Sequence, residues 1–294
     1  MEQVTWKSNL SKLVRGEHLT AEETEWFVDD LMRGNADPAA VGAVLATQQQ
    51  LGLTQEEVAG AAKAMVAHAV PLDVQAECTD IVGTGGDGMH TVNLSTMGAV
   101  IAAAAGVTIV KHGNRAASSK CGAADCLEAL GLPLDLDPQA VAAVADEVGI
   151  TFAFAKTFHP AMRFVGPVRA ALAVPCVFNV LGPLTNPAKP KHMAIGCANR
   201  AMSPVMAAVY AANGQTGMVY TSNEGLDEMA PTGRSASGNS VMATCVKPRS
   251  TRLRNWASIW SSSRTCAAAN LHRTRRPCAT CSQASRFRSV PPRC

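Results

Sequence analysis

The sequence predicts an α/β protein in which a small N-terminal helical domain precedes a larger, mostly parallel sheet flanked by helices. Helix-capping sequences dominate residues 1–71, and strand-length apolar runs alternate with helical segments through residues 72–233. An abrupt change in composition then marks residues 234–294 as a basic tail of low order. The hydrophobic content of 47% is ample for a core of this size.

Residues 1–71 are predicted to form a helical bundle. Residues 20–23 (TAEE) and 54–57 (TQEE) have the capping-box pattern, in which a Thr side chain and a Glu three residues later satisfy each other's backbone N–H groups. Asp37 followed by Pro38 predicts the start of a further helix, because Pro is favoured in the first turn.

Residues 72–233 are predicted to form the sheet and its flanking helices. The first unit is a strand at 79–82, an Ala-rich helix at 96–105 capped by Ser95 or Thr96, and a strand at 107–110. The later elements keep the alternation: a helix at 137–148, a strand at 150–155, a helix from His159, and strands at 193–198 and 218–221 with a helix between them. Loops at the carboxyl ends of parallel strands are where open α/β sheets bind ligands.

The loop after the first strand, residues 83–88 (GTGGDG), is suited to binding a phosphate. Gly residues allow positive φ, so successive N–H groups can converge on an anion, and the helix start that follows adds unpaired donors. The loop also fits the G-x-G-x-x-G pattern of dinucleotide-binding folds. That interpretation requires an acidic residue at the end of the second strand, where this chain has the basic segment 111–115 (KHGNR). A Walker loop is excluded because no Gly-Lys-Ser/Thr follows.

Charge is divided sharply along the chain. The formal net charge is +3, yet residues 234–294 contain 12 Lys and Arg and no Asp or Glu, which leaves 14 basic against 23 acidic residues before them.

No apolar run is long and uncharged enough to span a bilayer, and the N-terminus lacks the features of a signal peptide. We therefore expect a cytoplasmic protein with no membrane partner.

Several motifs occur in an order that resembles one enzyme family. They are GTGGDG at 83–88, NLST at 93–96, KHGNRAASS at 111–119, HPAMR at 159–163, PVR at 167–169, FNVLGPLTNP at 178–187 and GLDE at 225–228. Together they resemble the anthranilate phosphoribosyltransferase family from about Leu10 to Gly233. The resemblance implies transfer of a phosphoribosyl group from phosphoribosyl pyrophosphate to the anthranilate amine with release of pyrophosphate, the second step of tryptophan biosynthesis from chorismate. It also implies a nucleoside phosphorylase/phosphoribosyltransferase-like fold, residues 159–185 packed back on the helical domain, and a homodimer formed through the helical part.

The resemblance assigns site residues motif by motif. Phosphoribosyl pyrophosphate is expected at Gly83, Gly86, Asp87, Thr91, Asn93, Leu94, Ser95, Thr96, Lys111, His112, Gly113, Asn114, Arg115, Ser118, Ser119 and Ala123. Anthranilate is expected at Gly83, Asn114 and Arg169, with Arg169 as the partner of its carboxylate. Two Mg²⁺ ions are expected at Ser95, Asp227 and Glu228 together with substrate phosphate oxygens. No side-chain nucleophile is expected, because the amine is neutral at pH 7 and its positioning beside the ribose C1 supplies much of the rate.

Two features depart from the family pattern. Ala123 stands where the family usually has Ser, which puts one hydroxyl contact to phosphate in doubt. After Gly233 the Arg-rich composition indicates translation in a shifted frame, which a comparison of the other two frames of the coding DNA would test. Because such a tail cannot bury the apolar area of the segment that it replaces, we expect poor stability and weak or absent activity.

Three other interpretations are weaker. A pyrimidine nucleoside phosphorylase has a related architecture, but the HGN loop and the GLDE doublet favour the anthranilate enzyme. A nucleic-acid binder would use the basic tail for phosphate contacts, yet the tail's aromatic residues are only Trp256, Trp260 and Phe287, which disfavours specific binding. A zinc site at Cys278 and Cys281 lacks a second C-x-x-C pair.

Overall fold

A computed structural model describes residues 3–89, 91–116, 121–229 and 241–246 of the 294-residue chain. The chain divides into two units, residues 1–249 and 250–294, and all the described residues belong to the first. Two of the predicted site residues, Ser118 and Ser119, lie outside the described residues, as does most of the predicted tail.

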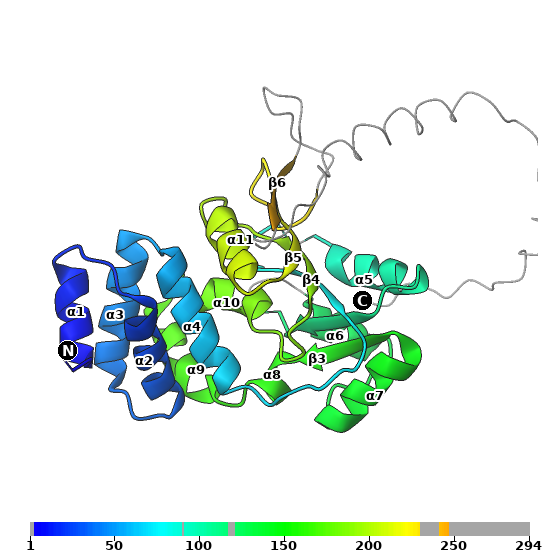
Figure 1. The fold of residues 1–294 in the computed structure, drawn as a ribbon, viewed down its shortest axis with the longest axis horizontal. Coiled ribbons are helices and arrows are strands. Elements are labelled where there is room, and N and C mark those ends of the chain that lie inside the picture. Colours follow the sequence, from blue (N-terminus) through cyan, green and yellow to red (C-terminus); the bar gives the residue numbers. More distant parts are fainter. Residues whose placement is uncertain (1–2, 90, 117–120, 230–240, 247–294) are drawn as a thin grey trace, which may run out of the picture. The chain divides into compact units, whose positions relative to one another are not determined.

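The N-terminal part is the predicted helical domain (Figure 1), with α1 at Trp6–Val14, α2 at Ala21–Met32, α3 at Pro38–Leu51 and α4 at Gln55–Ala67. Both predicted capping boxes are present. The backbone N–H of Glu23 donates to the Thr20 hydroxyl while the Glu23 carboxylate accepts from the Thr20 N–H, and Thr54 and Glu57 make the same reciprocal pair. These caps fix the starts of α2 and α4, which pack on each other over a buried apolar core.

Two later helices share that core. They are α9 at Met162–Leu172 and α10 at Phe178–Leu184. α9 packs against α2 and α3, and α10 packs against α4. Gly34, just after α2, has a φ of 79° that favours glycine, and a Cβ there would lie 2.7 Å from the ring of Phe164 in α9, which would have to shift. The segment 159–185 therefore connects the helical domain to the sheet.

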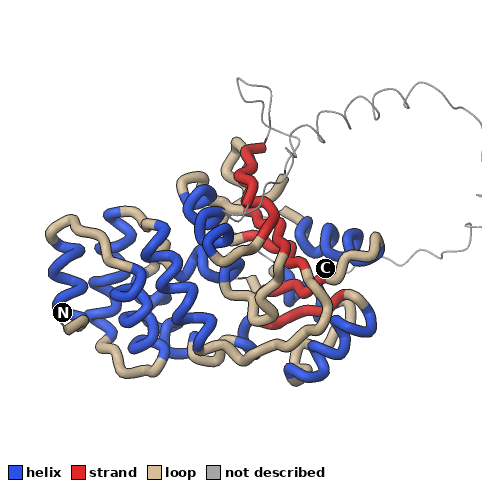
Figure 2. Tube along the Cα trace, viewed as in Figure 1, coloured by secondary structure: helices blue, strands red, loops and turns tan. Residues whose placement is uncertain are grey.

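Among the described residues the strands, red in Figure 2, form one sheet in the order β3-β2-β1-β4-β5-β6. They are β1 at Thr79–Gly83, β2 at Ile109–Gly113, β3 at Ile150–Phe154, β4 at His192–Gly196, β5 at Thr216–Ser222 and β6 at Val241–Val246. The first five run parallel to their neighbours and β6 runs antiparallel to β5, which confirms the mostly parallel sheet. Because the first five are parallel, their carboxyl ends lie at one edge, where ligand loops are expected.

Helices cover both faces of the sheet. α7 at Pro138–Val148, α10 and α11 at Met202–Ala212 pack on the face to which Val110 and Ile195 point. α5 at Leu94–Ala104 and α6 at Ala123–Ala129 lie on the other face, where Phe152 points, while the short α8 at Ala155–Phe158 follows β3 directly. Among the described residues, no helix has both the length and the apolar character needed to cross a membrane.

Some boundaries differ from the prediction for reasons visible in the structure. The second strand begins two residues later than predicted and continues to Gly113, because the segment predicted as a basic loop pairs with β3 as far as Phe154. The cap of α5 is Asn93, which makes no side-chain cap bond, instead of Ser95 or Thr96. The Ser95 hydroxyl instead accepts a hydrogen bond from Lys111 Nζ at 3.1 Å.

One strand lies in the segment predicted to be a low-order tail. Residues 241–246 (VMATCV) form β6, so the prediction is wrong for these residues. Val and Thr favour extended backbone, and the free edge of β5 offers unpaired N–H and C=O groups, which together outweigh the absence of a long alternating pattern.

Candidate active site

The loops that follow β1 and β5 meet at the carboxyl edge of the sheet. The backbone N–H of Gly85 donates to Asp227 Oδ2 at 2.7 Å, and the backbone N–H of Ser95 donates to Glu228 Oε1 at 3.2 Å. The acidic pair thus occupies donors of both the glycine-rich loop and the start of α5. Residues about 140 positions apart in the chain form one cluster.

This meeting depends on two glycines at strand ends. A Cβ at Gly83, the last residue of β1, would lie 2.1 Å from Asp227 Oδ2. A Cβ at Gly196, the last residue of β4, would lie 1.6 Å from the Asp227 carbonyl oxygen. Within the loop, Gly85 and Gly86 have φ of 69° and 79°, the left-handed region that favours glycine. The ends of β1 and β4 therefore lie so close to Asp227 that neither Gly83 nor Gly196 could carry a side chain.

Lys111 places a buried cation beside this cluster. Its side chain leaves β2 toward α5, and its Nζ donates to the Ile81 carbonyl at 2.6 Å and to Ser95 Oγ at 3.1 Å. The residue is only 3% exposed, and burial lowers the pKa of its ammonium while nearby carboxylates oppose that shift. The ammonium faces the helix start at which a phosphate would bind.

The carboxylates of Asp87, Asp227 and Glu228 lie close enough to repel one another. Burial raises the pKa of Glu228 to about 7, with Asp227 adding to the shift, and burial also raises the pKa of Asp227, with a contribution from Asp87. One oxygen of Asp87 is buried without a hydrogen-bond donor among the described residues. Repelling carboxylates and an oxygen without a donor are what a bound cation would stabilise, so these residues fit Mg²⁺.

The protein side chains would supply only some of the ligands of such a cation, and the others would come from bound phosphate and water. No three acidic, Cys or His side chains of the described residues already surround a single point. Mg²⁺ in phosphate-binding sites takes one or two carboxylates and completes its octahedron with phosphate oxygens and water. The carboxylate pair of Asp227 and Glu228 matches that arrangement.

A second layer of polar residues lies behind β1 and β2. Of its members only His112 was predicted to belong to the site, and its ring lies on the face of the sheet opposite to the Lys111 side chain. Asp80 is 1% exposed; its carboxylate accepts from the Asn186 side-chain amide at 2.9 Å and from the His112 backbone N–H at 3.3 Å. The His112 ring bonds the Gly182 carbonyl at 2.9 Å, and burial lowers the pKa of His112 to about 3. The sequence feature that could have revealed Asp80 is its place inside a short apolar strand (TDIV), where a carboxylate needs a buried partner.

His159 is a further member of this layer. Its ring lies 5.1 Å from that of His112 and bonds the Thr185 carbonyl at 3.0 Å. Burial lowers the pKa of His159 to about 4, so both imidazoles are neutral at pH 7.

The other predicted residues lie on several different elements. Thr91, Asn93, Leu94 and Thr96 lie before or at the start of α5, Gly113 and Asn114 lie at the end of β2, and Ala123 opens α6. Arg169 lies on α9 near the Cys176 thiol, whose pKa it lowers against the larger effect of burial. In the part of the chain that the structure describes, no hydrogen bond links Asn114 or Arg169 to the loops around Asp227.

Arg115 has partners within the protein that compete with a ligand. Its guanidinium bonds Glu128 at 2.6 Å and Asp125 at 3.0 Å, and it lies 5.7 Å from the centre of the Phe154 ring. These carboxylates raise the pKa of Arg115. The sequence prediction treated the whole basic segment as free to bind phosphate, whereas the Arg115 guanidinium is paired with two carboxylates of α6, Asp125 and Glu128.

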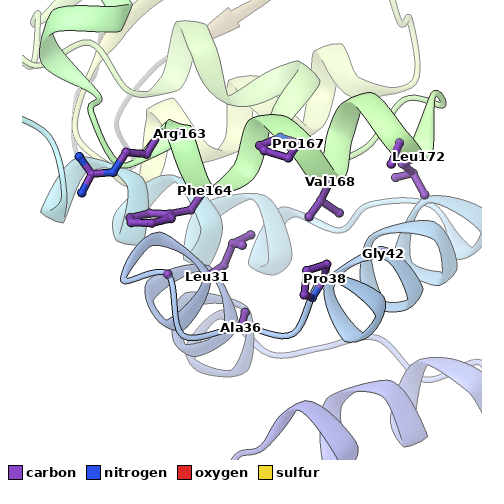
Figure 3. A pocket seen from close by; sticks show the side chains of 11 residues that line it. Leu31, Ala36, Pro38, Gly42, Arg163, Phe164, Pro167, Val168 and Leu172 are labelled. Atoms are coloured by element: carbon purple, nitrogen blue, oxygen red, sulfur yellow. The ribbon is translucent and has the colours of Figure 1, made fainter.

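A groove of about 550 Å³ lies apart from these residues, between α9 and the segment from α2 to α3 (Figure 3). Its walls are mainly apolar, including Leu31, Val168 and Leu172, and the Arg163 guanidinium lies 4.7 Å from the centre of the Phe164 ring at one end. No residue predicted to bind substrate or metal lines it.

Comparison with family models identifies both parts of the fold. The α/β-domain model of a glycosyl transferase family matches residues 75–244, and the helical bundle domain model of a glycosyl transferase family matches residues 7–69. The α/β match runs past Gly233, at which the resemblance read from the sequence ended, and includes part of β6.

Two similar curated proteins are anthranilate phosphoribosyltransferases. Anthranilate phosphoribosyltransferase of Salinispora arenicola is 51% identical over 239 residues, covering 79% of this chain and 68% of the relative. That of an Arthrobacter species is 50% identical over 231 residues, covering 79% of this chain and 66% of the relative. The chain thus spans about two thirds of the length of the curated relatives that it matches.

Solved structures agree with the sequences. The anthranilate phosphoribosyltransferase of Thermus thermophilus aligns with a TM-score of 0.73 at 40% identity, over 84% of this chain and 75% of that one. The Saccharomyces cerevisiae enzyme in complex with PRPP and Mg aligns with a TM-score of 0.73 at 30% identity, over 79% and 69%. Neither the pyrimidine nucleoside phosphorylase nor the nucleic-acid-binding alternative is supported by these similarities. The chain therefore belongs to the anthranilate phosphoribosyltransferase family, the phosphoribosyltransferases of tryptophan biosynthesis.

Proposed function

We propose that the loops of this chain bind phosphoribosyl pyrophosphate with Mg²⁺ and bring anthranilate to its ribose C1, so that the amine displaces pyrophosphate. The observation that carries this is the joining of the glycine-rich loop and the acidic pair by the hydrogen bonds from Gly85 to Asp227 and from Ser95 to Glu228. A phosphate cradle and a carboxylate pair at one place suit a ligand that is both phosphorylated and metal-bound.

The pyrophosphate end is assigned to the loop and the start of α5. Gly83, Gly86 and Asp87 with Asn93 to Thr96 offer backbone N–H groups and hydroxyls, and the helix dipole favours the negative charge. Lys111 adds a buried positive charge beside Ser95. In the transition state negative charge builds on the leaving pyrophosphate, and these fixed donors would stabilise it most strongly at that moment.

Two Mg²⁺ ions are proposed at Ser95, Asp227 and Glu228, where they would neutralise the leaving group's charge. Binding of a cation would favour the charged forms of Asp227 and Glu228, whose pKa values burial raises. Gly85 and Ser95 hold the two carboxylates in place through their N–H groups.

Anthranilate is assigned to Gly83, Asn114 and Arg169. Arg169 would pair with the carboxylate, and Asn114 would orient the ring from the exposed end of β2. We propose no covalent ribosyl-enzyme, because a neutral aromatic amine placed near C1 needs no prior activation. Single-turnover trapping of a ribosylated side chain would contradict this.

The state of this particular chain is a separate proposal. The family match ends at residue 244 and the Arg-rich composition after it fits a shifted frame, so turnover is expected to be weak even where binding is intact. A homodimer and a cytoplasmic location remain expectations from the family, and light scattering after size exclusion measures the first.

The test combines binding with turnover. Calorimetry measures phosphoribosyl pyrophosphate binding with and without Mg²⁺, and the loss of anthranilate fluorescence measures transfer. Replacing Asp227 and Glu228 by Ala should abolish the Mg²⁺-dependent part of both. Replacing the other Asp-Glu doublet, Asp146 and Glu147 in α7, is the matched control and should change neither. Binding that does not depend on Mg²⁺, or that survives loss of the first doublet, would overturn the proposal.

A further inference from the structure

Asp80 is a buried carboxylate that the proposed reaction does not use. It is the second residue of β1, is 1% exposed, and burial raises the pKa of its side chain to about 6. Burying a carboxylate costs free energy that an apolar side chain of the same size would not. Its role must therefore lie in what the carboxylate contacts.

Those contacts fix the end of β2. Asp80 Oδ1 accepts from the His112 backbone N–H at 3.3 Å, and Asp80 Oδ2 accepts from the Asn186 side-chain amide at 2.9 Å. The same amide donates to the Val110 carbonyl at 2.8 Å. Asp80 and Asn186 thus hold β2 at the residue before Lys111 and at the residue after it.

Lys111 reaches the ligand loops from this held segment. Its Nζ donates to the carbonyl of Ile81, the neighbour of Asp80, and to Ser95 Oγ. Because side chains alternate along paired strands, Asp80 and Lys111 point to opposite faces of the sheet. A carboxylate and an ammonium therefore lie on either side of the same two strand backbones, and in a buried environment opposite charges attract beyond direct contact.

We propose that Asp80 is a positioning residue of the phosphoribosyl pyrophosphate site. Together with Asn186 it fixes the end of β2, and its negative charge stabilises the Lys111 ammonium beside Ser95. This deepens the proposed function and rests on it for the ligand. A carboxylate that serves only the fold would change stability when replaced, whereas a positioning residue also changes phosphate binding, and does so through Lys111.

Thermal unfolding of the ligand-free chain tests the link between the two charges. The variants are Asp80→Asn, Lys111→Met and both together, with Asp146→Asn as a control whose carboxylate accepts backbone N–H groups from Gln75 and Ala76. The Tm shift caused by Asp80→Asn should be more unfavourable by roughly 3 °C or more with Lys111 present than with Met there. The control should shift Tm equally in both backgrounds. Equal shifts for Asp80→Asn would overturn the charge link.

Calorimetry with phosphoribosyl pyrophosphate and Mg²⁺ tests the positioning. Asp80→Asn should bind at least about 10-fold more weakly, Asp146→Asn within about 2-fold, and the double variant no more weakly than Lys111→Met alone. Unchanged affinity in a folded Asp80→Asn chain, or an equal further loss in the Lys111→Met background, would overturn the proposal.

A second variant covers the case in which Asp80→Asn does not fold. Asn186→Ala removes the amide that donates to both Asp80 and the Val110 carbonyl but keeps the Asp80 charge, so it should also weaken binding, and unchanged affinity would contradict the proposal. If the unsubstituted chain binds no phosphoribosyl pyrophosphate, the proposed function fails, and the unfolding experiment still decides the link between Asp80 and Lys111.

Discussion

Gly196→Ala should separate the acidic pair from the glycine-rich loop. The new Cβ would lie 1.6 Å from the Asp227 carbonyl oxygen, whereas even a tight contact needs 3.0 Å, so the two backbones must part by about 1.4 Å. β4 is hydrogen-bonded between β1 and β5 along its whole length. The loop that contains Asp227 is therefore the part expected to move.

That movement is enough to break the contact between the two loops. The bond from the Gly85 N–H to Asp227 Oδ2 is 2.7 Å long, and a displacement of about 1.4 Å along it exceeds hydrogen-bonding distance. A hydrogen bond to a charged group contributes about 1.5–3 kcal/mol, so Mg²⁺-dependent binding of phosphoribosyl pyrophosphate should weaken about 10- to 100-fold.

Calorimetry with Mg²⁺ and thermal unfolding measure the two consequences together. Gly98→Ala is the matched control, because a Cβ there meets nothing within 4 Å and the residue lies inside α5. The control should keep its affinity and gain about 0.5–1 kcal/mol of stability. If Gly196→Ala binds phosphoribosyl pyrophosphate as tightly as the control does, the close approach does not organise the site and the reasoning is refuted.

Three further predictions follow from the same structure. Asp227→Asn with Glu228→Gln should raise the Tm of the ligand-free chain, because it removes buried carboxylates with raised pKa values, yet it should remove the effect of Mg²⁺ on binding. His112 and His159 have pKa values lowered to about 3 and about 4 against 6.5, so the unfolded chain binds protons that the folded chain does not. Their stabilisation is complete above pH 6.5 and is lost as the pH falls, to about 4 for His159 and to about 3 for His112. His112→Asn should reduce that slope in urea unfolding by up to about 1.4 kcal/mol per pH unit. Thr54→Ala should lower the unfolding free energy by about 1 kcal/mol in the same assay, since it removes the cap of α4.

Features set by neighbours in the chain were accessible from the sequence. The caps at Thr20 and Thr54 need only residues three positions apart. The phosphate-binding loop can be predicted from its Gly residues, which allow positive φ, and from the helix that follows it. The alternation of strands and helices likewise predicts a parallel sheet and hence the edge at which ligands bind.

Features set by the packing of distant segments were not accessible. The hydrogen bond between Asp80 and Asn186 joins positions 106 residues apart, and the sequence around each residue does not indicate its partner. Arg115 looked available for phosphate, and only the position of α6 shows that Asp125 and Glu128 use its charge. A strand in a segment of tail-like composition depends on the free edge of β5, which local pattern does not reveal.

The glycine-rich loop and the acidic pair are better understood as one structural unit than as two motifs. Gly83 lies against Asp227, and the Gly85 N–H donates to that same carboxylate. Only Asp227 Oδ2 accepts from this N–H, so the other oxygen can bind a cation while the glycine-rich loop stays held. A cation bound there would fix the acidic pair and the loop together, so metal and phosphate binding at this edge should favour each other.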